Sequence, residues 1–252
     1  MIIFVFYNMS FYKNKQNHKI AYKSIKGRGL GIIFIHGLNS DMNGAKALKV
    51  ERYARKNNLN FIRFDCRGHG KSEGKFEEFT MSDWRKDLLD IIDYLARGPQ
   101  ILIGSSMGGW LMLLAAKSKK RKISGLIGLA AAADFGKDLF NSLSTKNKHD
   151  IKTKGITKYT YKGFAYYLTK EFFIHCTKNK ILNKKINFKK PVILIHGNKD
   201  NIVKDTMPIK IMKKLSSKNV QIKFLKSSDH SLSSSADLIN IKNSLDNIQL
   251  LI

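Results

Sequence analysis

The sequence predicts an α/β fold, in which a mostly parallel sheet is covered by helices on both faces. Short apolar runs typical of buried strands alternate along the chain with longer runs whose apolar residues recur at helical spacing. The chain has 252 residues, of which 43% are hydrophobic and only three are proline, so it is long enough to bury one sizeable core. These observations together favour a single α/β unit.

The first half of the chain supplies four of the expected strands. They are expected at residues 20–25, 30–35, 60–66 and 100–104, and the run at 30–35 is continuously apolar, as in a strand buried on both faces. Helices are expected between them, at residues 43–57 and 80–96, because their apolar side chains fall on one face. Thr80 or Ser82 is suited to begin the second helix, and Gly98-Pro99 to end it.

The second half continues the alternation after a helix at residues 107–117. Strands are expected at residues 125–130, 191–195 and 220–225, and helices at residues 205–215 and 232–250. The apolar run Met1–Tyr7 has no basic start and no cleavage site, so we expect an edge strand or a loose N-terminus rather than a signal peptide.

Residues 135–188 interrupt this alternation. They are rich in Lys, Tyr, Phe, Thr and Asn, and they contain no strong strand signal. Because such a stretch is too long for a simple connection, and because Phe172 and Phe173 give it apolar material to bury, we expect a small helical cap. The α/β core would then comprise residues 1–134 and 189–252.

The net charge and the two cysteines limit which partners and which cellular location are expected. The net charge is +27, but only eight of the 46 basic residues are Arg, and the abundance of Lys, Asn and Ile matches A/T-rich codons. No nucleic-acid module accompanies the lysines, so we expect no specific nucleic-acid partner, while a weak attraction to anionic surfaces stays open. No run is long enough for a transmembrane segment. Cys66 and Cys176 are isolated, which predicts reduced thiols, no structural zinc and a cytoplasmic location.

The motif Gly104-x-Ser106-x-Gly108 carries the chemistry. With 18 Gly and 20 Ser in the chain, the bare pattern arises by chance in roughly one such chain in ten. Here, however, it lies between an apolar strand and an apolar helix. A serine on such a tight turn presents its hydroxyl at the helix N-terminus, and glycines on either side allow the strand and the helix to approach closely. Ser106 is therefore the candidate nucleophile.

A serine nucleophile needs a base and an orienting carboxylate, which in this fold class follow it as acid and then histidine. Asp200 comes after the strand at 191–195, and His230 comes after the strand at 220–225. Both would lie at the carboxyl ends of parallel strands, where such sheets place their sites. We predict His230 as general base and Asp200 as its partner. Asp229 is a weaker alternative, since adjacent side chains rarely meet correctly.

Three further features complete the predicted site. The oxyanion of an acyl-transfer reaction needs donors, for which the backbone N–H groups of Leu38 and Met107 are placed correctly after a strand and at a helix start. His36 and His196 end strands and are expected to be structural. The turn at residues 65–72 has glycines suited to positive φ, and we expect it to be a structural turn rather than a phosphate loop.

Five of these features, in this order, resemble the α/β-hydrolase superfamily: His36-Gly37, Arg67-Gly68-His69-Gly70-x-Ser72, Gly104-x-Ser106-x-Gly108, His196-Gly197-x-x-Asp200 and His230. Other segments are similar to the mitochondrial palmitoyl-protein thioesterases of that superfamily and their bacterial relatives: residues 42–48, 61–65, 84–87, 98–113 and 228–230. The resemblance implies serine-dependent cleavage of S-acyl thioesters and acyl-glucuronide esters. It is weakest in the cap, which would select the substrate.

The sequence thus predicts a serine esterase or thioesterase that acts through an acyl-enzyme on a small molecule or an S-acylated protein. It implies no metal and no organic cofactor. Two alternatives remain open. One is a general carboxylesterase for short esters, and the other is a basic surface-binding protein that kept the fold without the chemistry. The complete Ser106, Asp200 and His230 set argues against the second.

Overall fold

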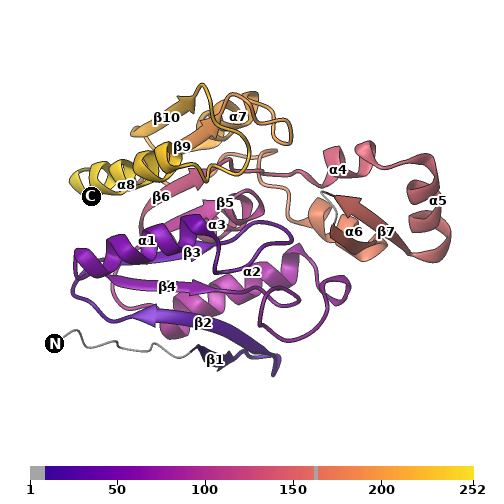
Figure 1. Ribbon diagram of the computed structural model, residues 1–252, viewed down its shortest axis with the longest axis horizontal. Helices are drawn as coiled ribbons and strands as arrows, with labels where there is room; N and C mark the ends of the chain where they lie inside the picture. Colours follow the sequence, from indigo (N-terminus) through magenta and orange to yellow (C-terminus); the bar gives the residue numbers. More distant parts are fainter. Residues whose placement is uncertain (1–8, 162–163) are drawn as a thin grey trace.

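The computed structural model describes residues 9–161 and 164–252, so the predicted segment Met1–Tyr7 lies outside the described residues. Eight strands of the described chain form one sheet, and their bounds are β1 (Ser10–Lys13), β2 (Lys19–Ile25), β3 (Gly31–Ile35), β4 (Asn60–Phe64), β5 (Gln100–Ser105), β6 (Ile123–Leu129), β9 (Val192–Gly197) and β10 (Val220–Leu225). Their order across the sheet is β1-β2-β4-β3-β5-β6-β9-β10 (Figure 1). The strand β2 pairs antiparallel with β1 and β4, and the other pairings are parallel.

The central parallel strands β3, β5 and β9 are buried on both faces, as continuous apolar runs require. Strand β3 shows this best, because all five of its residues are buried. Ile33 aligns with Ile62 on β4 and with Leu102 on β5, which stacks three large side chains across the sheet. The prediction of a mostly parallel α/β sheet is confirmed. The short edge strand β1 was not predicted.

Helices cover both faces of this sheet. On one face, α1 (Ala45–Lys56) and α8 (Ser235–Leu250) contribute to a core that includes Ile32 and Phe34 of β3. On the other face, α2 (Met81–Asp90), α3 (Met107–Ser118) and α7 (Thr206–Lys214) pack around a core that includes Ile33 and Ile35. The period-2 alternation of the strand therefore divides its side chains between two cores.

The helix predicted at residues 80–96 consists of two parts. A short 3-10 turn, η1 (Phe76–Glu78), precedes α2, whose N-cap is Thr80. The Asp83 carboxylate accepts hydrogen bonds from the backbone N–H and the hydroxyl of Thr80, at 3.0 and 2.7 Å. The last turn, η2 (Ile91–Leu95), winds as a π-helix rather than an α-helix. Ser82 does not cap this helix, because its hydroxyl contacts the cap segment instead.

The segment at 135–188 contains three helices and a hairpin in its described part. The helices are α4 (Gly136–Ser142), α5 (Thr145–Lys154) and α6 (Lys170–Lys178), and β7 (Ile156–Tyr161) pairs antiparallel with β8 (Phe164–Thr169). These elements lie beyond one end of the main sheet (Figure 1). The segment contains helices, as expected, but the hairpin was not predicted. Its Thr and Tyr side chains favour an extended backbone.

Polar contacts fasten this segment to the core at its two ends. The Asp134 carboxylate accepts hydrogen bonds from the backbone N–H groups of Ile181 and Leu182, each at 2.9 Å. The Trp110 indole on α3 donates to the Asn179 carbonyl at 3.1 Å. The chain thus leaves the core and returns to it at adjacent points, close to the helix that follows Ser106.

Candidate active site

Ser106 lies on a strained turn between β5 and α3. Its backbone has φ 53° and ψ −116°, a conformation that non-glycine residues rarely adopt and that often marks a functional site. A Cβ on Gly104 would lie 2.3 Å from the Gly108 carbonyl oxygen, and a Cβ on Gly108 would lie 2.3 Å from that of Ile35. The predicted need for glycine on both sides of the serine is confirmed, because strand and helix leave no space for side chains there.

The structure brings Ser106, His230 and Asp200 into one hydrogen-bonded chain. The distance from Ser106 Oγ to His230 Nε2 is 3.0 Å, and from His230 Nδ1 to Asp200 Oδ2 it is 2.8 Å. An Nδ1–H that donates to a carboxylate leaves Nε2 as the acceptor for the serine hydroxyl. The residues come from three loops at the carboxyl ends of β5, β9 and β10. This arrangement allows a proton to pass from the serine to the histidine.

The surroundings of Asp200 hold its carboxylate in the ionised form. Burial of its fully buried side chain raises its pKa, but hydrogen bonds from His230 and from the backbone N–H groups of Val203 and Ile202 outweigh this effect. The net result is a pKa of Asp200 below the ordinary value. The N–H groups of Ile202 and Val203 both donate to Oδ1, at 2.9 Å, which leaves Oδ2 directed at His230.

The alternative carboxylate, Asp229, is turned elsewhere. Its Oδ1 accepts hydrogen bonds from the backbone N–H and the hydroxyl of Ser231, at 2.9 and 2.5 Å.

His196, expected to be structural, is buried at the end of β9, and its Nε2 lies 3.0 Å from the Val203 carbonyl. Burial lowers the pKa of His196, which favours the neutral donor form.

Two contacts that the sequence interpretation missed hold the loop of His230 in place. The Lys46 ammonium, near the start of α1, donates to the Ser231 carbonyl. Burial lowers the pKa of Lys46 to about 8, although the negative charges of Asp229 and Asp237 act to raise it. The Ser228 hydroxyl donates to the Asp237 carboxylate, which also accepts from Ser234 at the start of α8. The Ser234-x-x-Asp237 spacing was a readable capping signal. Nothing in the sequence pointed to Lys46.

The predicted oxyanion donors lie on segments that border Ser106. Met107 is the first residue of α3, and the first N–H groups of a helix have no partner within it. The loop that contains Leu38 passes close by, since a Cβ on Gly37 would lie 3.3 Å from that of Ser106. His36 braces this loop. Its Nδ1 lies 2.7 Å from the Gly37 carbonyl, and its Nε2 accepts from the Cys66 N–H at 3.0 Å. The oxyanion role itself stays a prediction.

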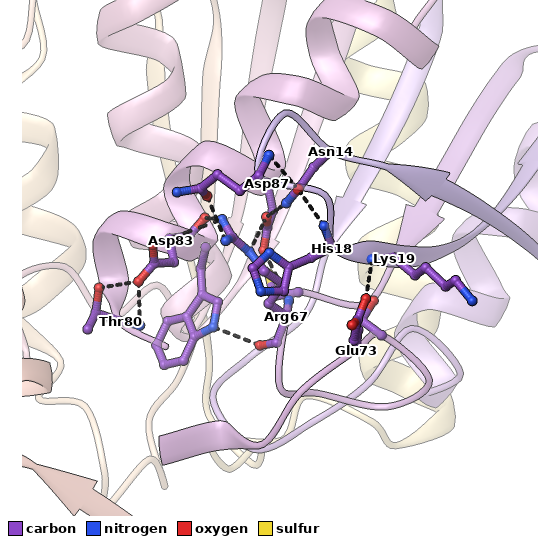
Figure 2. Close-up of polar contacts among 12 residues, drawn as sticks. Asn14, His18, Lys19, Arg67, Glu73, Thr80, Asp83 and Asp87 are labelled. Atoms are coloured by element: carbon purple, nitrogen blue, oxygen red, sulfur yellow. Dashed lines mark hydrogen bonds and ion pairs between the residues drawn. The ribbon is translucent and has the colours of Figure 1, made fainter. Parts of the chain in front are cut away.

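The turn after β4 is a structural hub, as expected. Arg67 is buried and its Nε lies 2.8 Å from Asp87 Oδ1, while its other nitrogens donate to Gln16 and to the Asp83 carbonyl. Figure 2 shows this guanidinium between α2 and the segment that joins β1 to β2, where Asn14 also donates to Asp87. Desolvation raises the pKa of Asp87 to about 6, although Arg67 opposes the shift. The hub therefore fixes the turn beside the site without taking part in it.

Aromatic rings connect this turn with the cap. The His69 ring lies 4.9 Å from that of His36 and 5.1 Å from that of Trp84, and burial lowers the pKa of His69 to about 3. Further rings extend the contact into the cap through Phe172 on α6, which lies 6.1 Å from Trp84. The neutral histidines and the aromatic side chains thus form one apolar seam between core and cap.

No group of three or more His, Cys, Asp or Glu among the described residues could hold a metal ion. Within the same residues, no helix is long and apolar enough to cross a membrane.

The comparisons with known proteins agree with this fold. Residues 30–163, just over half of the chain, match the family described as serine aminopeptidase, S33. The chain is 40% identical over 248 residues to the mitochondrial palmitoyl-protein thioesterase ABHD10 of Homo sapiens, and equally to that of Bos taurus. Each match covers 96% of this chain and 80% of the relative.

Solved structures match as well. The α/β-hydrolase domain-containing protein 10 from mouse superposes with a TM-score of 0.88 at 36% identity, over 96% of this chain and 98% of that one. A hydrolase from Agrobacterium vitis superposes with a TM-score of 0.89 at 25% identity, over 96% and 99%. The chain belongs to the α/β-hydrolase family, and it is a serine hydrolase.

Proposed function

We propose that this enzyme cleaves acyl thioesters and esters through an acyl-enzyme on Ser106, with a preference for long S-acyl chains of the kind attached to proteins. The observation that carries the proposal is the hydrogen-bonded chain from Asp200 through His230 to Ser106. The name of the relatives, palmitoyl-protein thioesterase, supports the substrate class.

In the proposed first half-reaction, Ser106 Oγ forms a bond to the acyl carbon while His230 Nε2 takes the hydroxyl proton. Asp200 keeps the imidazole in the correct tautomer and stabilises its positive charge. The Leu38 and Met107 N–H groups would stabilise the oxyanion, a contribution for which each donor is typically worth ~10²–10³ in rate. The carbon–sulfur bond then breaks, and His230 gives its proton to the departing sulfur, which leaves as a thiol.

In the second half-reaction, water replaces the thiol. His230 accepts a proton from water as its oxygen attacks the acyl carbon, and the acyl–serine bond breaks with the proton returned to Ser106 Oγ. The products are a carboxylic acid and the free enzyme. Phe135 extends the apolar seam, because its ring lies 6.4 Å from that of Phe172 and 5.4 Å from that of Trp110. We place the acyl chain of the substrate along this seam.

A hydrolysis profile tests this function. Matched S-acyl and O-acyl substrates with chains from two to sixteen carbons would be compared on the purified protein. We expect the highest kcat/KM for long S-acyl chains. The blank is Ser106→Ala, which should also lose labelling by a fluorophosphonate probe. The matched control is Ser105→Ala, which changes the neighbouring serine and should keep both turnover and labelling.

Each other result has a definite meaning. A preference for short O-esters would replace the thioesterase by a general carboxylesterase with the same site. Undiminished labelling of Ser106→Ala would remove Ser106 from the role of nucleophile. No turnover of any substrate by the unmodified chain would favour the basic surface-binding alternative.

A reducing compartment such as the cytoplasm also belongs to this proposal. Cys66 and Cys176 are free and buried, and burial raises the pKa of both thiols, so neither is suited to form a disulfide. The curated relatives carry a mitochondrial designation. Fractionation of the source cells, with probes for both compartments, distinguishes these locations.

We further propose residues 1–134 and 189–252 as the hydrolase core and 135–188 as a cap. We call the point where this segment leaves and rejoins the core, at Asp134 and at Ile181 and Leu182, the neck. Hydrogen bonds from the backbone of Ile181 and Leu182 to the Asp134 carboxylate close the neck and support the division.

A further inference from the structure

The cap holds an open cavity of about 530 Å³ between its three helices. Its wall is mainly apolar and includes Phe140 of α4, Ile151 of α5 and Phe173 and Ile174 of α6. A cavity of this size is in the range that binds small molecules and lipid chains. It lies in the part of the molecule that projects beyond the sheet (Figure 1), so it can meet a surface that the core does not touch.

The rim of this cavity is basic. Five exposed lysines contribute to the lining, at positions 137, 152, 170, 178 and 180, and no acidic residue does. They come from α4, from α5, and from α6 and its end, so that positive charge surrounds an apolar interior. From residue 136 to residue 180 the sequence has ten Lys against three Asp or Glu.

We propose that this face of the cap docks on anionic phospholipid membranes. The lysine ammoniums would bind lipid phosphates, and the apolar wall would accept part of one acyl chain. Charge complementarity selects this occupant, because an apolar cavity ringed only by cations matches a molecule with an anionic head and an apolar tail. An acidic protein would satisfy the rim but would leave the apolar wall exposed.

Vesicle co-sedimentation of the full chain tests this proposal. The vesicles are phosphatidylcholine alone, or phosphatidylcholine with about 30 mol% phosphatidylserine. We expect binding to the second kind only, with weakening as salt is raised. The variant Lys137→Gln/Lys152→Gln/Lys170→Gln removes one rim charge from each helix. It should lower the affinity by about a hundredfold, since each of the three lysines near an anionic surface is worth roughly a fivefold factor.

The matched control is Lys120→Gln/Lys210→Gln/Lys213→Gln, which removes the same charge from exposed lysines of the core. It should keep most of the affinity. Equal losses in the two variants would show that total charge, not the cap, attracts the membrane, and would overturn the proposal. Absence of binding to phosphatidylserine vesicles would overturn it as well. Turnover of a soluble short ester, unchanged in the rim variant, shows that the site is intact and separates this outcome from failure of the proposed reaction.

Discussion

The candidate active site and the cap are built by different physical means. At the carboxyl edge of the sheet, Ser106, Asp200 and His230 are fixed by backbone geometry and directed hydrogen bonds. In the cap, side chains meet mainly through apolar and aromatic contacts, such as those of Phe140 with Phe173. Hydrogen bonds fix the positions of their atoms within tenths of an ångström, whereas apolar contacts tolerate the replacement of one apolar side chain by another of similar volume.

This difference indicates how one fold can keep its chemistry while its substrate changes. The residues that we assign to bond breaking lie on the sheet and its loops, whose positions many contacts determine together. The residues that we expect to select the acyl chain lie in a segment attached at a neck. The following experiments test this division, from the largest expected effect to the smallest.

The substitution Asp200→Asn should lower kcat by ~10³–10⁴, because an amide at Oδ2 favours the wrong tautomer of His230. KM should change little, since Asp200 does not touch the substrate. Steady-state kinetics on a soluble thioester measure both. The control is Asp205→Asn in the same loop, which lies at the N-cap of α7 without a side-chain cap bond and should stay within about twofold. A fall in kcat of only about tenfold in Asp200→Asn would show that Asp200 is not the carboxylate that orients His230.

The substitution Asp87→Ala should destabilise the fold by about 3–5 kcal/mol, because it leaves the Arg67 guanidinium buried without its carboxylate. Urea denaturation followed by circular dichroism gives the free energy of unfolding. Lys86→Ala, an exposed change on the same helix, should alter it by less than about 0.5 kcal/mol. Similar values for the two variants would show that the hub contributes little to stability.

The substitution Phe135→Ala should alter selectivity more than reactivity. Phe135 contacts both Trp110 and Phe172, so its removal opens the seam along which we place the acyl chain. We expect the ratio of kcat/KM for sixteen-carbon over two-carbon thioesters to fall by about tenfold, while fluorophosphonate labelling stays within twofold. Phe11→Ala, on the exposed edge strand, is the control. An equal loss on both chain lengths would contradict a role in selectivity.

The smallest expected effect is the contribution of Asp200 to pH-dependent stability. Its folded pKa is depressed, so the folded state binds this proton less tightly than the unfolded chain does. The stabilisation is therefore full above pH ~4 and is lost as the pH falls through the lower, folded pKa. The difference in unfolding free energy between the unmodified chain and Asp200→Asn should narrow as the pH falls from about 4 to 2.5. A difference that persists to pH 2.5 would refute this.

Most of the sheet could be predicted from the sequence, because parallel strands buried on both faces appear as uninterrupted apolar runs. The candidate site could also be located, since Ser106, Asp200 and His230 each follow a predicted strand. Their contact is a matter of topology, which places the ends of β5, β9 and β10 along the same edge.

The cap was harder to predict, for two reasons. The hairpin signal was present, as two runs rich in Thr and Tyr separated by Lys162-Gly163, but the lysines between the aromatic residues obscured it. Lys46 could not be identified at all, because its contact joins α1 to a loop 185 residues away and depends on the packing of α1 against α8. Long-range polar contacts of this kind leave no local pattern.

The order of the strands has one further consequence. Ser106, the proposed nucleophile, follows β5 in the interior of the sheet. His230, its proposed base, follows β10, which is an edge strand and is only partly buried. Edge elements open more readily than central ones. A transient separation of β10 from β9 would therefore move His230 away from Ser106 while the rest of the sheet stayed intact. On heating, the activity would then be lost at a lower temperature than the folded structure.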